Sequence, residues 1–406
     1  MYRAAVLASL LAVHAIACVD AGPGSDAVGT ASQDVVGGRN APSGKWPDVV
    51  ALMFDDVAEC TGTLVAPSVV LTADHCRKSF GTVEAIVGTS NLDGQEGERI
   101  AVKRQVGYPD GQNTYDVALF ILDHPSTRPP RPLATGWTRF DIFDGAAVAI
   151  VGFGAIDPDG AQYISQLQEA ESIVTDADCS NDGVGCHTSI RPDGELGAGG
   201  DGIDSCKGDS GGPLYLLASY GTFLAGVTSR GYENVTTPVC SQGGIYTRPD
   251  RLVEWIEKES GEQVIEGPSP TANGILASKG EQAATVVQHG DPKGQIPHTF
   301  TIAKEPAHGT ATVNELGAVV YKPAKDYLGD DVVAVTVTDP AQAGRQVTLS
   351  IPVSVVEGDI VGGCATTPRP AGTILIAAAA LLVGLRRRRT RPGSGAPAPR
   401  DSLRST

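Results

Sequence analysis

Between residues 35 and 261 the chain consists of short apolar runs separated by glycine, proline, asparagine and aspartate. Residues 69–72, 148–151 and 223–227 are examples. Short apolar runs bounded by turn-forming residues predict β-strands. Residues 251–259 differ, because apolar side chains recur there at helical spacing. The pattern therefore predicts many short strands and one helix near the end of this region.

A second β-rich module is expected at residues 268–357, which contain no cysteine. Apolar and polar residues alternate along 332–337 and 347–353, as in strands with one buried face. The module resembles the Ig-like or cadherin-like modules of bacterial surface proteins at residues 306–310, 320–323 and 327–330. The resemblance implies a β-sandwich that acts as a spacer or binds a cell-surface or polymer partner. Three scattered histidines are expected on its surface: His289, His298 and His308.

The N-terminus has the features of an export signal. Arg3 precedes an almost wholly apolar stretch at residues 4–17, which ends in the small-x-small pattern of a cleavage site. We expect a signal peptide at 1–17 and a linker or propeptide at 18–34. A short buried helix is the alternative for the apolar stretch, and lipidation of Cys18 also stays open.

At the other end, the apolar residues 372–385 are followed directly by four arginines. This run is shorter than the about 20 residues that a membrane helix needs. The segment 362–391 resembles the MYXO-CTERM sorting tails of myxobacterial surface proteins, and 392–406 is expected to be disordered. The resemblance implies display on a bacterial cell surface or outer membrane, or secretion. An unprocessed inner-membrane helix is the alternative.

Charge and cysteine content narrow the partners and the compartment. The net charge of −16 argues against nucleic acid as a partner. We expect a monomer. Two of the eight cysteines, Cys18 and Cys364, lie in the processing segments, which leaves six for disulfides in an exported chain.

Three segments far apart in the sequence supply the groups of a catalytic triad. Ser210 lies in a glycine-rich segment, His75 follows an apolar run, and Asp116 precedes another. A serine hydroxyl needs a base within hydrogen-bond reach, and the base needs a third group to orient it. The chain order His, Asp, Ser differs from the orders of subtilisin and the α/β-hydrolases.

Over about residues 35–261 the sequence resembles the chymotrypsin/trypsin family. The resemblance implies an all-β fold of two six-stranded Greek-key β-barrels with a C-terminal helix, here followed by the β-sandwich domain. It implies a secreted or surface-anchored serine endopeptidase with His75 as base, Asp116 as its orienting acid and Ser210 as nucleophile. The backbone N–H groups of Gly208 and Ser210 would form the oxyanion hole.

The same resemblance identifies an activation site at residues 35–38. Cleavage before Val35 would free an α-amino group that pairs with Asp209. The residue before this bond is Asp34, where the family usually has Arg or Lys, so we expect a separate activating protease. The alternative is that Val35 merely begins a strand.

The resemblance also implies three disulfides: Cys60–Cys76, Cys179–Cys186 and Cys206–Cys240. A fourth one that is common in the family would join the second barrel near Val148 to Leu216, and both of its cysteines are absent together.

Asp204 lies six residues before Ser210, where trypsin-like members carry the acid that pairs with a substrate Arg or Lys. The other predicted substrate-binding residues are Ser205, Ser229, Gly231 and Gly244. A surface acid is the alternative for Asp204. Arg230 replaces the usual Trp on the substrate-binding strand, where it would compete for Asp204 or favour acidic substrate groups, and Lys207 adds a charge at the pocket rim.

Two further positions carry expectations. Asp74 replaces a usual Ala beside His75, and a carboxylate that approaches the imidazole would move the activity optimum to higher pH. We expect no cofactor and no metal site. Calcium at Glu96 and Glu98 is a weak alternative, because the remaining ligands are not recognisable.

Two other functions stay open. The chain could be a catalytically idle trypsin-fold protein for adhesion or display, or a protease without tryptic specificity. An intact His75, Asp116 and Ser210 count against the idle protein.

Overall fold

A computed structural model of the chain describes residues 35–181, 184–233, 239–294, 297–342 and 344–358. The predicted signal peptide, linker, sorting segment and C-terminal tail lie outside these residues. Within the described part, no helix is long and apolar enough to cross a membrane. The described residues divide into two compact units, one of 35–269 with 290–294 and one of 270–289 with 297–358.

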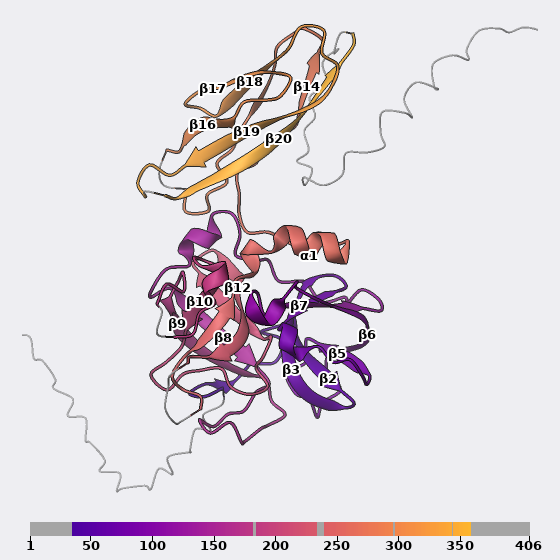
Figure 1. Cartoon of the computed structure of the whole chain (residues 1–406), viewed down its shortest axis with the longest axis vertical. Coiled ribbons are helices and arrows are strands. Elements are labelled where there is room, and N and C mark those ends of the chain that lie inside the picture. The colour runs from indigo at the N-terminus through magenta and orange to yellow at the C-terminus, as the bar shows by residue number, and fades with distance from the viewer. Residues whose placement is uncertain (1–34, 182–183, 234–238, 295–296, 343, 359–406) are drawn as a thin grey trace, which may run out of the picture. The chain divides into compact units, whose positions relative to one another are not determined.

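Six antiparallel strands close the first barrel in the order β2-β3-β4-β7-β6-β5 (Figure 1). The barrel closes because β5 pairs with β2, with Val50 opposite Val87. Leu52, Leu64 and Phe120 are fully buried in its interior. The strands are β2 (Val49–Phe54), β3 (Val57–Ala66), β4 (Val69–Thr72), β5 (Val83–Val87), β6 (Glu98–Gly107) and β7 (Ala118–Leu122).

A second antiparallel barrel follows in the order β8-β9-β10-β13-β12-β11 and closes through β11 and β8. Val148 and Leu216 are direct cross-strand partners, at the place where the family resemblance would put a further disulfide. A short strand, β1 (Arg39–Asn40), adds to β9. The barrel strands are β8 (Ala147–Gly152), β9 (Gln168–Asp176), β10 (Glu195–Ala198), β11 (Pro213–Ala218), β12 (Gly221–Gly231) and β13 (Gly244–Thr247). The expected pair of six-stranded barrels is therefore confirmed.

The predicted helix is α1 (Val253–Ser260), with Ile256 fully buried. It begins later than the sequence pattern indicated, because Pro249–Arg251 form a separate 3-10 turn. Gly261 ends it with φ of 79° and an N–H that donates to the Glu257 carbonyl at 2.8 Å. A positive φ of this kind suits glycine and stops an α-helix.

The second unit contains two sheets, β14-β20-β19-β16 and β15-β18-β17. Alternate residues of β19, such as Val333, Val335 and Val337, are buried, as the alternating sequence pattern predicted. The prediction that all three histidines lie on the surface is wrong for His298, which is 6% exposed and stacks on His289. The strands are β14 (Ile275–Ser278), β15 (Ala283–Val286), β16 (Thr299–Lys304), β17 (Gly309–Val313), β18 (Ala318–Pro323), β19 (Gly329–Thr338) and β20 (Gln346–Val356).

Candidate active site

His75 lies on a short 3-10 helix, η1 (Asp74–Cys76), directly after β4. Its backbone N–H donates to Asp116 Oδ1 at 3.0 Å, and its ring Nδ1 lies 2.7 Å from Asp116 Oδ2. The neighbouring Cys76 is joined to Cys60 by a disulfide. Two contacts to one carboxylate fix the ring, so Nε2 is the nitrogen left to act on a substrate.

Asp116 stands immediately before β7 and is 6% exposed. The Ser229 hydroxyl donates to Asp116 Oδ2 at 2.7 Å. Burial opposes ionisation of this carboxyl, but the hydrogen bonds from His75 and Ser229 outweigh burial and lower its pKa. Asp116 is thus an ionised acceptor that holds His75 in the tautomer with a proton on Nδ1.

Ser210 lies in the loop before β11, and this loop packs against the segment that leads to His75. The Ser210 carbonyl accepts from the Thr61 N–H at 2.9 Å. Gly211 has φ of 79°, and a Cβ there would lie 2.6 Å from the Ala73 nitrogen and collide with the Thr72 hydroxyl. Only glycine therefore lets this loop approach η1 so closely.

The backbone around Ser210 leaves two donors free. Within the described residues, neither the Gly208 nor the Ser210 N–H donates a hydrogen bond. Gly208 has φ of 97°, a conformation that glycine adopts without strain. Free backbone N–H groups on both sides of one residue are suited to bind a developing oxyanion.

Asp209 is fully buried beneath this loop. Its Oδ1 accepts from the Gly154 N–H and its Oδ2 from the Cys206 N–H, both at 2.8 Å. Burial raises the pKa of Asp209 to about 7 despite these two bonds. No ion pair within the described residues reaches this carboxyl. A cationic partner would stabilise the ionised form of such a buried carboxylate.

Val35, the first described residue, is also fully buried. Its φ is 45°, a conformation that β-branched residues rarely adopt. Val36 forms an antiparallel bridge with Asp204, whose N–H donates to the Val36 carbonyl at 3.1 Å. The predicted activation segment is therefore inserted beside the predicted specificity acid.

Asp204 is 1% exposed, so it is not the surface acid of the alternative interpretation. Its Oδ2 accepts from the N–H groups of Ser241 and Gly243 at 2.9 and 3.0 Å, while its buried Oδ1 has no hydrogen bond within the described residues. Burial raises the pKa of Asp204 to about 6. A buried oxygen without a donor is a ready acceptor for an incoming cation.

Among the other predicted pocket residues, Gly244 and Ser205 lie beside Asp204, whereas the Ser229 hydroxyl donates to Asp116 instead. A Cβ at Gly244 would lie 3.5 Å from Asp204 Oδ1, and a Cβ at Gly231 would meet nothing within 4 Å. The Ser205 hydroxyl accepts from the Tyr246 hydroxyl at 3.3 Å. Lys207 is exposed, and its side chain lies next to Gly160.

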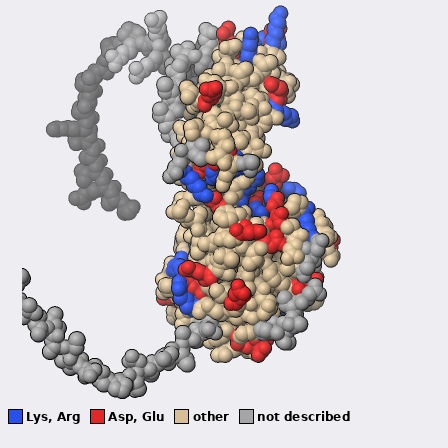
Figure 2. Space-filling view, turned by 90° about the vertical axis from the view of Figure 1, so that its left-hand side faces the viewer, with Lys and Arg blue, Asp and Glu red and all other residues tan. Residues whose placement is uncertain are grey.

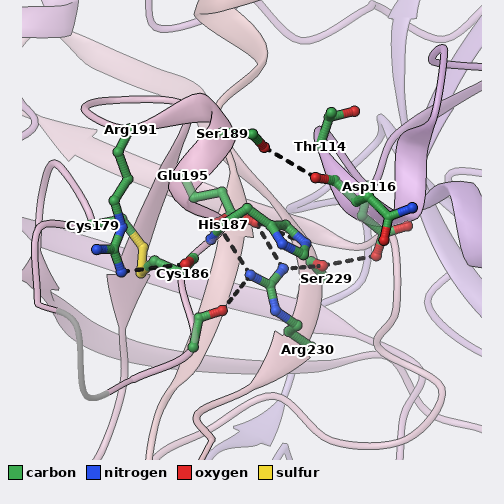
Figure 3. A network of polar contacts seen from close by, with 12 residues as sticks. Thr114, Asp116, Cys179, Cys186, His187, Ser189, Arg191, Glu195, Ser229 and Arg230 are labelled. Atoms are coloured by element: carbon green, nitrogen blue, oxygen red, sulfur yellow. Dashed lines mark hydrogen bonds and ion pairs between the residues drawn. A yellow bond between two sulfur atoms is a disulfide. The ribbon is translucent and has the colours of Figure 1, made fainter.

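Arg230 does not pair with Asp204. Its guanidinium instead pairs with Glu195 of β10, with distances of 2.7 Å from NH1 to Oε1 and 3.1 Å from NH2 to Oε2 (Figure 3). Glu195 is a site residue that sequence analysis missed. Its one signal was an acid within a run of apolar and glycine residues, which favours burial with a partner.

Asp74 does not contact the imidazole either. Its carboxylate pairs with Arg77, at 2.5 Å from Oδ1 to Nε and 3.2 Å from Oδ2 to NH2. The guanidinium compensates the charge of Asp74, which removes the reason for the expected upward move of the pH optimum. Asp74 and Arg77 together line a cleft of about 430 Å³ beside His75.

The three predicted disulfides, Cys60–Cys76, Cys179–Cys186 and Cys206–Cys240, are all present.

The two candidate calcium ligands accept hydrogen bonds from protein groups: Glu96 from Ser43 and Ser90, and Glu98 from Ser126 and Thr127. Basic side chains lie beside acidic ones on the face in Figure 2. Arg39–Glu171 and Arg99–Glu84 are two exposed ion pairs of the two-barrel unit.

Comparison with known proteins identifies both units. Residues 35–256, more than half of the chain, match the family Trypsin. The chain belongs to the trypsin family. Residues 268–352 match the family described as bacterial Ig domain. In the sequence of this trypsin-family chain, a bacterial Ig domain therefore follows the two barrels.

Similar proteins include two relatives and one solved structure. Serine protease 56 of Mus musculus is 36% identical over 250 residues, which cover 58% of this chain and 39% of that protein. Brachyurin of Leptuca pugilator is 30% identical over 239 residues, which cover 56% of this chain and 99% of brachyurin. The chain thus spans less than half of serine protease 56 and nearly all of brachyurin. A solved structure of neuropsin, a serine protease expressed in the limbic system of mouse brain, is 26% identical with a TM-score of 0.46, covering 55% of this chain and 98% of that one.

Proposed function

We propose that residues 35–261 form a serine endopeptidase in which His75, Asp116 and Ser210 are the catalytic triad. The observation that carries the proposal is the pair of contacts from one carboxylate to His75, next to a Ser210 loop that Gly211 brings against the same segment. The trypsin-family match and the similarity to serine protease 56 support it.

Each group then has a role. His75 Nε2 takes the proton of the Ser210 hydroxyl as its oxygen attacks the scissile carbonyl carbon. The N–H groups of Gly208 and Ser210 bind the resulting oxyanion. Collapse of this intermediate breaks the C–N bond, the imidazolium gives its proton to the leaving amine, and water then hydrolyses the acyl-enzyme on Ser210.

We also propose that the enzyme cuts after Arg or Lys. The buried Oδ1 of Asp204 supports this, because a cationic side chain supplies the missing partner and an apolar one leaves the oxygen unpaired. The neighbouring Gly244 leaves room above the carboxylate.

Finally, we propose that the chain is a zymogen that a separate protease activates at the 34–35 bond. The new α-amino group of Val35 would pair with Asp209, which is buried without a cation within the described residues. Cleavage also removes the φ torsion of Val35, whose value of 45° costs of the order of 1–3 kcal/mol in an intact chain.

Export is part of this proposal. Three disulfides suit an oxidising compartment, and the bacterial Ig domain suits a spacer or binder at a cell surface. The terminal segments would supply the export signal and the sorting tail.

The first experiment labels the protein with a fluorophosphonate probe before and after cleavage at the 34–35 bond, with S210A as control. Labelling of the cleaved wild type alone supports the activated protease. Absence of labelling after cleavage, or labelling that persists in S210A, contradicts it and favours the idle display protein. Peptide substrates with Arg, Lys, Phe or Ala before the cut bond then test the specificity separately.

A further inference from the structure

A nearly buried ion pair adjoins Ser229 (Figure 3). Arg230 follows Ser229 on β12, and Glu195 lies on β10, with β13 between these two strands. The Glu195 side chain is 1% exposed and that of Arg230 is 24% exposed. Two parallel N–H···O bonds join them, the strongest geometry that an arginine and a carboxylate form.

The guanidinium also reaches the proposed triad through one hydroxyl. Arg230 NH1 donates to Ser229 Oγ at 3.1 Å, and Ser229 Oγ donates to Asp116 Oδ2 at 2.7 Å. An arginine can only donate, so it occupies a lone pair of the Ser229 oxygen. The single proton of that hydroxyl is therefore directed to Asp116, which in turn holds His75.

We propose that Arg230 and Glu195 are positioning residues of the triad. Arg230 orients the Ser229 hydroxyl toward Asp116, and Glu195 fixes the guanidinium and compensates its charge. The inference rests on the proposed protease function. It assigns a role to the residue that replaces the expected tryptophan, whose single N–H could not contact a carboxylate and a hydroxyl together.

A third bond fixes the position of the guanidinium. Arg230 NH2 donates to the carbonyl of Gly185 at 2.7 Å, inside the small loop that the Cys179–Cys186 disulfide closes.

Other titratable or charged groups lie around the ion pair and the triad. His187 Nε2 lies 4.0 Å from Glu195 Oε1, Glu233 lies beside Gly185, and Arg191 donates to the Cys186 carbonyl. The remaining groups are the Asp74–Arg77 pair, Asp204 and Tyr232.

The test is the acid limb of kcat/KM against pH, measured on cleaved enzyme with the best peptide substrate. E195Q removes a negative charge and keeps the shape, so it should destabilise the imidazolium and move the limb about 0.5–1 pH unit lower. R230Q leaves Glu195 unpaired and should move the limb higher by a similar amount. Opposite shifts from two partners of one ion pair are not expected of residues that only support the fold.

Two more variants separate charge from orientation. R230K keeps the positive charge, so the acid limb of its pH profile should stay near that of the wild type. The lysine ammonium lacks the planar pair of N–H donors that orients Ser229, so kcat should fall roughly ten- to a hundredfold at unchanged KM. In R230Q/E195Q the two charge effects cancel, and kcat should fall in the same way. If R230Q does not fold, E195Q and R230K still give the two readouts.

A matched control comes from the same unit. D250N breaks another buried arginine pair, Arg248–Asp250, which has no hydrogen bond to Ser229. It should leave the limb in place. Fluorophosphonate titration counts the folded active sites in every variant.

Wild-type kcat and an unmoved limb in E195Q and R230Q would overturn the inference while the protease function stands, as would shifts in the same direction. A cleaved wild type that hydrolyses no substrate and takes no label would instead overturn the proposed function, and the inference with it.

Discussion

Two buried aspartates close to Ser210 differ in what they lack. Burial raises the pKa of Asp204 to about 6 and that of Asp209 to about 7. Both oxygens of Asp209 accept backbone hydrogen bonds, and what it lacks within the described residues is a countercharge. Asp204 has one oxygen without any donor. At the scale of single residues, the proposed roles follow from this difference: Asp204 would receive a substrate cation and Asp209 a cation of the protein itself.

The ratio of kcat/KM for Arg over Ala substrates should fall as the pH is lowered through about 6, because Asp204 of the free enzyme then takes up a proton. D204N should lower the wild-type ratio at pH 8 on the order of a hundred- to a thousandfold, since it removes the charge partner. D201N alters an exposed acid three residues away and serves as control. An unchanged ratio in D204N would contradict the pocket assignment.

Asp209 should make the uncleaved protein less stable as the pH rises. The folded state keeps this proton up to about pH 7, whereas the unfolded chain loses it near pH 4, so unfolding is favoured progressively between these values. The loss is on the order of a few kcal/mol.

Urea unfolding of S210A at pH 4.5 and pH 8, with and without D209N, measures this loss without autolysis. D209N should remove most of the decrease with pH. Cleavage before Val35 should also remove it, because an ammonium partner keeps Asp209 ionised. If the free energy of unfolding depends on pH in the same way in S210A and in S210A/D209N, Asp209 is not the group responsible.

At the scale of elements, every proposed catalytic group stands at a strand end or in a loop next to one. His75 follows β4, Asp116 precedes β7, Ser210 precedes β11 and Ser229 lies on β12. The strands are rigid because each is paired on both sides, so the loops inherit fixed positions. Close approach of the Ser210 loop to η1 depends on a missing side chain at Gly211.

G211A should therefore abolish fluorophosphonate labelling of cleaved enzyme and lower kcat at least about a hundredfold, because the new methyl group pushes Ser210 away from His75. G145A is the matched control. Gly145 also has a positive φ, 91°, but a Cβ there meets nothing within 4 Å. Both variants share the conformational cost of alanine, and only G211A has the collision. Equal labelling of the two would refute the argument.

At the scale of the whole molecule, the two units have different tasks. The two-barrel unit holds all three disulfides and all proposed catalytic groups, whereas the described part of the Ig domain gathers none of them. The proposed activation segment reaches the proposed specificity acid through the Val36–Asp204 bridge. In the proposed zymogen, control of activity would depend on the 34–35 bond, where the described residues begin.

D34R should convert that bond into a trypsin site. Brief trypsin treatment should then give a new N-terminus at Val35, which terminal sequencing would detect. It should also raise kcat/KM on the order of a hundredfold or more, because an enzyme with an incomplete oxyanion hole typically loses activity by about that factor. The double variant D34R/D209N is cut equally but should stay near the uncleaved level. Full activity of the uncut protein would argue against a zymogen.

The sequence by itself determined the strand-rich architecture and the triad candidates, and its resemblance to the chymotrypsin/trypsin family implied the three cysteine pairs. Strands 69–72 and 332–337 could be predicted because apolar runs, alternation and turn residues are local properties of the sequence. His75, Asp116 and Ser210 could be predicted because each stands in a short segment whose composition is recognisable in the sequence alone. What depends on contacts across the fold was decided only by the tertiary structure. Arg230 pairs with Glu195 across β13, and His298 is buried against His289. Asp74 pairs with Arg77, only three residues along the chain, and the structure decided that this contact excludes the imidazole. A charged side chain goes to whichever partner lies within about 4 Å, and the sequence alone does not show which residues those are.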